Sequence, residues 1–272
     1  MKNILVPIDF SACSRQGAQA AVFLAGRLKS RIHLLHVTYV SPEHEGGITS
    51  EEIAARIVEA EKRLKKLRDS KLFSKVDVTV TVETGVAYDR IIEIAHSRKV
   101  DMIVMGAHGA GETDQLFVGS TTQRVIRTAN CPVLSIKKGQ KLSSIRRIML
   151  PSDIEENASK TLTPIIDLAE KLEAEIDLTF INTPEKFADT ATAEKRMNRL
   201  IRKNTTAKTN LFIYNDFGRE QGILNFLKRR KPQIVSLVTH ARRGKPSYVT
   251  SVTDTVLLHA DVPVISTLLK NR

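Results

Sequence analysis

The residues best suited to chemistry lie in a glycine-rich loop that follows the apolar run of residues 102–105. They are Met105, the last residue of that run, and the loop residues Gly106, His108, Gly109, Gly119, Ser120 and Thr121. Glycines let a backbone approach a ligand closely and adopt positive φ angles. Ser120 and Thr121 begin a periodic segment, and the free N–H groups and dipole of a helix N-terminus attract anions. Because residues 107–118 include no lysine or arginine, backbone groups and hydroxyls would hold the anion, which favours a phosphate chain over DNA.

A second set of candidate residues lies at the end of the first apolar run. Pro7, Ile8 and Asp9 follow the strand-like residues 4–6, and open α/β sheets bind ligands at the carboxyl ends of their strands. Asp9 can accept a hydrogen bond from a ribose or adenine group, or contact a magnesium ion beside phosphates. Its structural alternative is to cap the turn that follows. His108 has two interpretations as well, as a phosphate ligand or as a solvent-facing side chain.

An internal duplication shows which elements position these residues. Residues 3–9 recur as 147–153, so the sequence predicts two tandem domains, 1–140 and 144–272, joined by a polar linker. Each domain is predicted to be a Rossmann-like, doubly wound α/β domain: a five-stranded parallel sheet of order 3-2-1-4-5 with helices on both faces. In this order the first and fourth strands are neighbours. The glycine-rich loop and the turn after the first strand should therefore meet at the switch point of the sheet.

Composition and charge limit the possible functions. The chain has 272 residues, of which 42% are hydrophobic, enough for buried cores. No apolar run approaches the ~20 residues of a membrane helix, no signal-peptide pattern opens the chain, and the two cysteines lack metal-site spacing; a cytoplasmic protein is expected. The net charge of +12 raises nucleic acid as a partner, but the basic residues are spread over both halves and aromatics are only 5%, which argues against base stacking.

The spacing of the glycine-rich loop resembles that of the universal stress protein family. Two residues separate Gly106 from Gly109, and nine separate Gly109 from Gly119. Residues 130–133 (NCPV) then lead into the last strand of the half, as in that family. The resemblance covers essentially the whole chain, strongly in residues 1–137 and weakly in the second half.

That resemblance implies an ATP-binding regulatory protein of the stress response. ATP, with or without magnesium, would be held by the N-terminal domain, with Asp9 in the place of the acid used by the ATP-binding members. Ile8 and Val37 would contact the adenine. Slow ATP hydrolysis is compatible with the family, although nothing in the sequence resembles a dedicated catalytic base. The alternatives are an interaction or scaffold protein that binds no nucleotide and, as a weaker hypothesis, a nucleic-acid-binding protein.

The second half departs from the pattern at the loop. Residues 238–241 (VTHA) stand where the first half has Gly106 to Gly109, and Thr250 and Ser251 replace Gly119 and Ser120. Side chains at three glycine positions block the close approach of a backbone. We therefore expect the second domain to have lost ordinary ATP binding.

The last strands of the two halves bear on assembly. Residues 132–136 and 263–267 would each form an apolar edge strand, which must be covered. Single-domain relatives, as the resemblance implies, often dimerise through this strand. The two halves are therefore predicted to form an intramolecular pseudo-dimer, while a homodimer of whole chains and an unknown protein partner remain open.

Overall fold

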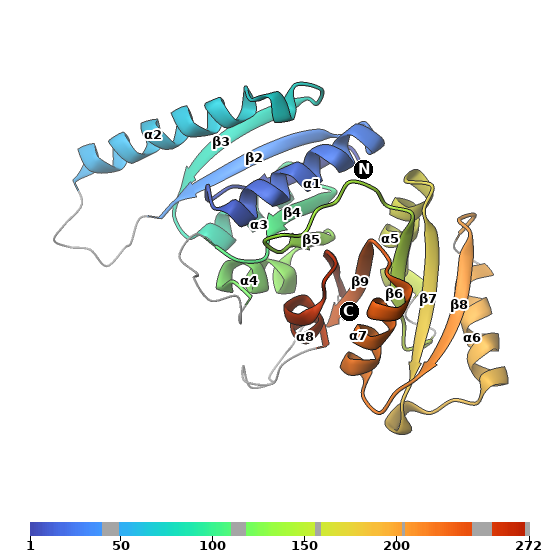
Figure 1. Cartoon of the computed structure of the whole chain (residues 1–272). Helices are drawn as coiled ribbons and strands as arrows, with labels where there is room; N and C mark the ends of the chain where they lie inside the picture. The colour runs from blue at the N-terminus through green and yellow to red at the C-terminus, as the bar shows by residue number, and fades with distance from the viewer. Residues whose placement is uncertain (40–48, 110–117, 156–158, 203–204, 241–251, 270–272) are drawn as a thin grey trace. The chain divides into compact units, whose positions relative to one another are not determined.

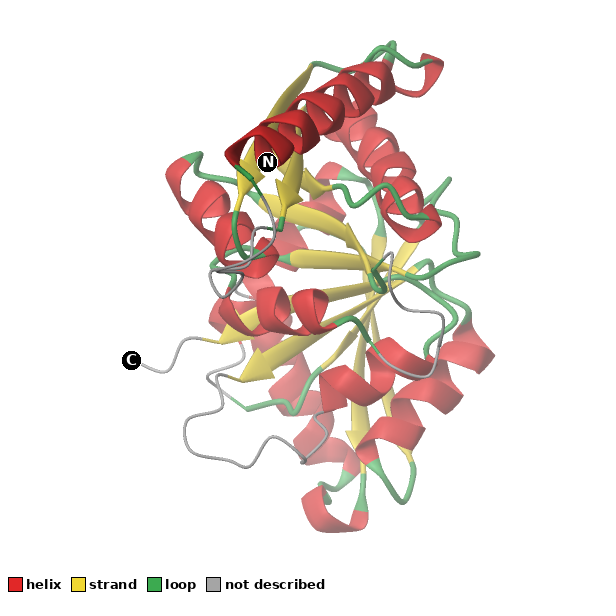
Figure 2. Cartoon of the chain, turned by 90° about the vertical axis from the view of Figure 1, so that its left-hand side faces the viewer, coloured by secondary structure: helices red, strands yellow, loops and turns green. Residues whose placement is uncertain are grey.

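The structure, a computed structural model, describes every residue except 40–48, 110–117, 156–158, 203–204, 241–251 and 270–272. The chain forms two compact units, residues 1–141 and residues 142–272 (Figure 1). In each unit the strands form a parallel sheet with helices lying against it (Figure 2).

The first unit alternates strands with helices. Its strands are β1 (Asn3–Pro7), β2 (Arg31–Thr38), β3 (Val78–Thr84), β4 (Met102–Gly106) and β5 (Val133–Ile136). Its helices are α1 (Ala12–Leu28), α2 (Ser50–Arg68), the 3-10 turn η1 (Lys71–Phe73), α3 (Ala87–Ser97) and α4 (Ser120–Thr128). The order across this unit is β3-β2-β1-β4-β5, and all four pairings are parallel. The carboxyl ends of β1 and β4 are therefore neighbours.

The second unit repeats this arrangement. Its strands are β6 (Arg147–Pro151), β7 (Glu175–Asn182), β8 (Thr209–Asn215), β9 (Ile234–His240) and β10 (Val264–Leu269). Its helices are α5 (Ser159–Lys171), the 3-10 turn η3 (Pro184–Lys186), α6 (Thr190–Arg202), α7 (Arg219–Arg230) and α8 (Val252–His259). The parallel order β8-β7-β6-β9-β10 is again 3-2-1-4-5, so the predicted fold class is confirmed. The pseudo-dimer of the two halves stays a prediction.

Caps decide where α2 and α6 begin. Thr49 forms the capping box that the sequence predicts at the start of α2. In the second unit the sequence predicts one helix over residues 184–203, but α6 begins only after Asp189. The carboxylate of Asp189 accepts a hydrogen bond from the N–H of Thr192 at 2.9 Å, which satisfies one of the free donors of the first turn. The residues before it form the separate turn η3.

The first unit buries a polar cluster near the start of its second strand. His33 is 6% exposed, and its Nδ1 lies 2.6 Å from Thr79 Oγ1 and 3.1 Å from a guanidinium nitrogen of Arg98. Because a guanidinium can only donate, Nδ1 must accept and the imidazole is neutral. Burial and the charge of Arg98 lower the pKa of His33 to about 4.

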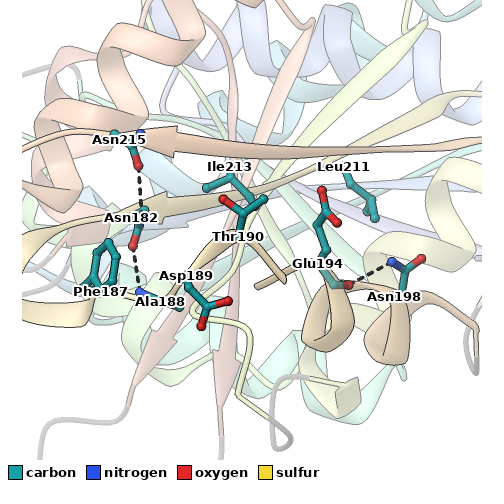
Figure 3. A pocket seen from close by; sticks show the side chains of 10 residues that line it. All are labelled: Asn182, Phe187, Ala188, Asp189, Thr190, Glu194, Asn198, Leu211, Ile213 and Asn215. Atoms are coloured by element: carbon teal, nitrogen blue, oxygen red, sulfur yellow. Dashed lines mark hydrogen bonds between the residues drawn. The ribbon is translucent and has the colours of Figure 1, made fainter. Parts of the chain in front are cut away.

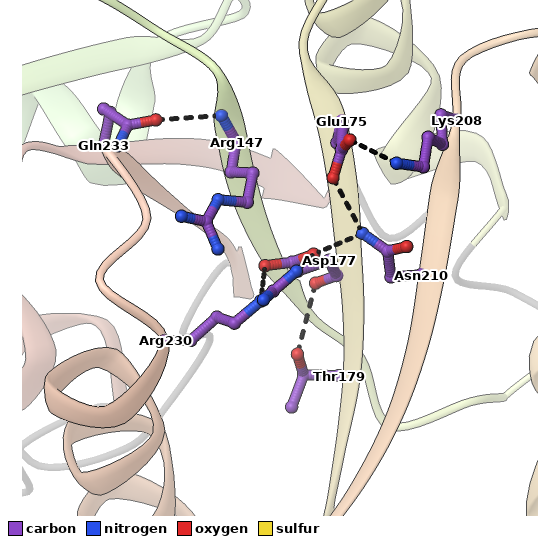
Figure 4. A network of polar contacts seen from close by, with 8 residues as sticks. All are labelled: Arg147, Glu175, Asp177, Thr179, Lys208, Asn210, Arg230 and Gln233. Atoms are coloured by element: carbon purple, nitrogen blue, oxygen red, sulfur yellow. Dashed lines mark hydrogen bonds and ion pairs between the residues drawn. The ribbon is translucent and has the colours of Figure 1, made fainter.

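The second unit carries a carboxylate at the equivalent place (Figure 4). Asp177 and Asn210 are register partners across the second and third strands, as His33 and Thr79 are in the first unit. Asp177 is fully buried; it accepts hydrogen bonds from Asn210 Nδ2 and Arg230 Nε, both at 2.9 Å. The hydrogen bond to Asp177 raises the pKa of Arg230. The duplicated frame therefore holds a neutral imidazole in one unit and an ion pair in the other.

His33 should make the protein less stable in acid. Its folded-state pKa of about 4 lies below the ordinary 6.5, so the folded chain binds fewer protons and loses stability as the pH falls from 6.5 towards 4. Urea unfolding at pH 8 and pH 5 should differ by about 2 kcal/mol on this account. His33→Gln should reduce the difference, whereas His96→Gln, at an exposed position of α3, should not. An unchanged pH dependence in His33→Gln would contradict this assignment.

Candidate functional site

A cavity of about 140 Å³ opens at the carboxyl ends of β1 and β4. All the site residues predicted from the sequence line it: Pro7, Ile8, Asp9, Val37, Met105, Gly106, His108, Gly109, Gly119, Ser120 and Thr121. The structure therefore brings the turn after β1, the end of β2 and the glycine-rich loop together at the switch point of the first sheet.

The turn after β1 is held by hydrogen bonds of its backbone. The N–H of Ile8 donates to Leu35 O at 2.8 Å, and Nδ1 of His36 lies 2.7 Å from Ile8 O. Because a carbonyl can only accept, that nitrogen carries the proton. Asp9 accepts a hydrogen bond from the N–H of Ser11 at 2.9 Å, so it does cap the turn as its structural alternative proposes. One carboxylate oxygen serves this cap, and the other, Oδ2, lies beside Gly109.

Phe10 fixes the direction of this turn. Its φ of 63° lies in the left-handed region, which is uncommon for residues other than glycine. The ring lies 4.8 Å from that of His36, and the guanidinium of Arg63 on α2 lies 4.0 Å from its centroid. Packing of this kind stabilises a backbone conformation that costs about 1–3 kcal/mol. Ile154 has a φ of 55° at the corresponding place after β6, so both units have a left-handed residue in the turn after their first strand.

The N-terminus of α4 forms the opposite side of the cavity. The N-cap residue is Gly119, and no side chain caps the helix. Helix geometry leaves the N–H groups of Ser120 and Thr121 without an intrahelical acceptor. The hydroxyls of Ser120 and Thr121 do not cap the helix. Instead, Thr122 Oγ1 donates to Gly106 O at 2.9 Å and ties the start of α4 to the end of β4.

Gly106 and Gly109 are needed for different reasons, and neither is among the residues with positive φ. A Cβ on Gly106 would lie 2.9 Å from the carbonyl carbon of Cys13 in α1, and a Cβ on Gly17 would lie 3.2 Å from the backbone of β4. The missing side chain of Gly106 therefore lets α1 pack closely against β4, and its contact with a ligand stays a prediction. The nearest atom to a Cβ on Gly109 is Asp9 Oδ2 at 3.6 Å, an ordinary contact at the cavity wall.

Sequence reasoning missed several lining residues: Ser14, Leu35, Ala87, Ile91 and Thr122. Periodicity carried a signal for three of them. Ala87 and Ile91 are four residues apart in α3 and so share a helix face, and Leu35 precedes Val37 by two residues in β2 and so shares its side of the sheet. Ser14 and Thr122 had no comparable signal, because their roles depend on how α1 and α4 pack.

Metal and thiol chemistry have little support in the part of the chain that the structure describes. There, no group of three His, Cys, Asp or Glu side chains is arranged to hold a metal ion. Magnesium commonly binds one or two carboxylates together with phosphate oxygens, so Asp9 fits only that shared mode. Burial raises the pKa of the Cys131 thiol to about 11, and the Cys13 thiol is buried 3.0 Å from Ile136 O.

Among the residues that the structure describes, no helix is long and apolar enough to cross a membrane.

The corresponding region of the second unit is described only in part. Strand register places Val238 where β4 has Gly106, and the hydroxyls of Thr239 and Thr253 lie 3.1 Å apart and buried. The other replacements, Ala241, Thr250 and Ser251, lie outside the described residues. The loss of ATP binding in this unit therefore stays a prediction.

The two glycines should respond differently to an added methyl group. Gly106→Ala forces the α1 backbone away from β4, and overpacking of this kind costs about 1–3 kcal/mol of unfolding free energy. Gly109→Ala places its methyl in ordinary contact and should change stability by less than about 0.5 kcal/mol. Urea denaturation of both variants measures the difference. Equal stability of the two variants would show that α1 does not depend on Gly106.

Comparisons with known proteins agree with this geometry. The model of the universal stress protein family matches residues 1–137. A universal stress protein of Methanocaldococcus jannaschii is 32% identical over 146 residues, which cover 52% of this chain and 84% of that protein. A universal stress protein of Synechocystis is 35% identical over 141 residues, which cover 50% of this chain and 85% of that protein. The crystal structure of a universal stress protein from Archaeoglobus fulgidus matches with a TM-score of 0.80 and 17% identity over 98% of both chains, which shows a common fold. The chain belongs to the universal stress protein family.

Proposed function

We propose that the protein is an ATP-binding regulatory protein of the stress response, with the nucleotide held by its first unit. One observation carries the proposal: a single cavity joins an apolar wall to an uncapped helix N-terminus. A base needs the first surface and a phosphate chain needs the second. The bound nucleotide would act as a regulatory signal, with slow hydrolysis at most.

The apolar wall suits an adenine ring. Ile8, Leu35, Ile91 and Met105 are all at most 5% exposed and line the cavity together with Val37. Both backbone polar groups of Ile8 are already hydrogen-bonded within the protein. This residue therefore offers a base mainly its apolar side chain, and burial of a flat aromatic ring against such surface is favourable.

The helix N-terminus suits the phosphates. Aligned peptide dipoles place roughly half a positive charge at the start of a helix, and its N–H groups point at the bound anion. At about 140 Å³ the cavity is smaller than the roughly 300–1,000 Å³ of complete ligand sites. We therefore expect bound ATP to extend beyond the cavity, with the base on the apolar wall and the phosphates passing Gly109 towards Ser120 and Thr121.

Asp9 would act on the ribose or on magnesium. A carboxylate beside a polyphosphate is repelled unless a hydroxyl or a cation lies between them. Its Oδ2 lies 3.6 Å from the place of a Cβ on Gly109, at the wall along which the phosphates would pass. A scaffold function without nucleotide is the alternative, and the two are separated by whether the purified chain binds ATP.

ATP binding should depend on the missing side chain of Gly109. Gly109→Ala leaves the unliganded fold without a steric conflict but places a methyl group where the phosphates pass. We expect at least a tenfold weaker Kd by calorimetry, about 1.4 kcal/mol. The matched control is Gly26→Ala on α1, whose added Cβ meets nothing within 4 Å and should leave the Kd unchanged. Equal ATP affinity in the parent and in Gly109→Ala would contradict the proposal that the phosphates of ATP pass Gly109.

The stoichiometry should be one ATP per chain. The replaced glycines of the second half motivate this expectation. Calorimetric titration of the full chain measures the number of sites directly. Two equivalent sites per chain would mean that the second unit also binds ATP.

A further inference from the structure

An open groove of about 800 Å³ lies in the second unit, between α6 and the face of β8 (Figure 3). Leu211, Ile213 and Asn215 alternate along β8 and form its floor. Phe187 and Asn182 lie towards one end of it, and Glu194 lies towards the other (Figure 3). The groove belongs to different residues from those of the ATP cavity.

The elements beside this groove are shorter than their counterparts in the first unit. The connection from β7 to α6 spans residues 183–189, whereas residues 39–49 connect β2 to α2. α6 has 13 residues and α2 has 19. The side chains of Leu211 and Ile213 are partly exposed, as are those of Val80 and Val82 at the matching places of β3.

The groove wall is held by its own hydrogen bonds. Asn182 donates Nδ2 to Asn215 Oδ1 and accepts at Oδ1 from the N–H of Ala188, both at 3.0 Å. These bonds join the ends of β7 and β8 to the segment that carries Phe187 and Asp189. A preformed wall reduces the ordering that a bound partner must supply.

The charge of the groove is opposite to that of the chain. Asp189 and Glu194 line it, and none of its lining residues is lysine or arginine, although the chain carries a net charge of +12. The hydrogen bonds from Thr192 lower the pKa of Asp189, so this carboxylate stays ionised. The groove thus offers negative charge where a basic surface would otherwise repel a cation.

The apolar residues of the groove suit the stem of a cationic side chain. Phe187 is 74% exposed, and an exposed aromatic face attracts an ammonium or guanidinium group. Long basic side chains bury their methylene groups on apolar surface while the charged end stays in water. Leu211 and Ile213 provide such a surface between the aromatic ring and the carboxylates.

From these observations we propose that this groove is a docking site for an extended, lysine- or arginine-containing segment of a protein partner. The floor from Leu211 to Asn215 spans four strand steps, about 13 Å at ~3.3 Å per residue, which matches four to five residues of extended chain. A volume near 800 Å³ also exceeds what a single small cation fills. Every second side chain of an extended peptide points to the same side, so a peptide that alternates basic and apolar residues would direct one of the two kinds towards this floor.

A labelled heptapeptide of alternating lysine and valine is a direct probe of the full-length protein. Fluorescence anisotropy should show binding that weakens as salt is raised, because the charges are at the surface. Glu194→Gln and Phe187→Ala should each weaken it about three- to fivefold. The matched controls, Asp167→Asn on α5 and Phe217→Ala at a 92% exposed position, should have no effect. ATP titration should be the same in all four variants, which keeps this test separate from that of the nucleotide site.

Three outcomes would overturn the proposal. The first is unchanged peptide affinity in both groove variants. The second is equal affinity for the same peptide with glutamine in place of each lysine, because the carboxylates would then recognise nothing. The third is spermidine binding as tightly as the peptide and displacing it, because the groove would then be a site for small cations.

Discussion

The close approach of α1 to β4 is the contact on which the first unit depends. Gly17 and Gly106 lack side chains where the two backbones meet, and a Cβ on either would lie 2.9–3.3 Å from the other element. The helix begins directly after the turn that carries Asp9, so the docking of α1 also sets the position of that turn. The end of β4 is in turn tied to α4 by Thr122. One backbone contact therefore positions both sides of the candidate site.

The two units have the same strand order and the same turn after the first strand, but their buried polar side chains differ. Both units keep a left-handed residue after the first strand, Phe10 or Ile154, and both place an arginine at the end of the helix that follows the third strand. In the first unit this arginine holds an imidazole neutral, whereas in the second it pairs with the buried Asp177. Loss of Arg230 would leave Asp177 as a buried charge without its ion-pair partner.

The two units offer opposite electrostatic preferences to ligands. The cavity of the first unit presents helix N–H groups, which favour an anion, while the groove of the second unit presents two carboxylates and an exposed aromatic ring. On a chain of net charge +12, a diffuse attraction for anions needs no special site, whereas an attraction for cations does. The two proposed sites have no lining residue in common, so a nucleotide and a basic partner would not compete for the same residues.

The sequence by itself determined the fold class and eleven of the sixteen residues that line the candidate cavity. The evidence was apolar runs of strand length, an internal repeat and the spacing of Gly106, Gly109 and Gly119. These features depend on residue types and their order, so they can be seen without a structure. The start of α6 at Thr190 was missed, because capping depends on which of several polar residues turns its side chain to the free N–H groups. The reason for Gly106, the hydrogen bond of Thr122 and the groove beside β8 were decided only by the tertiary structure. Each depends on the distance between elements far apart in the chain, and helix packing sets that distance.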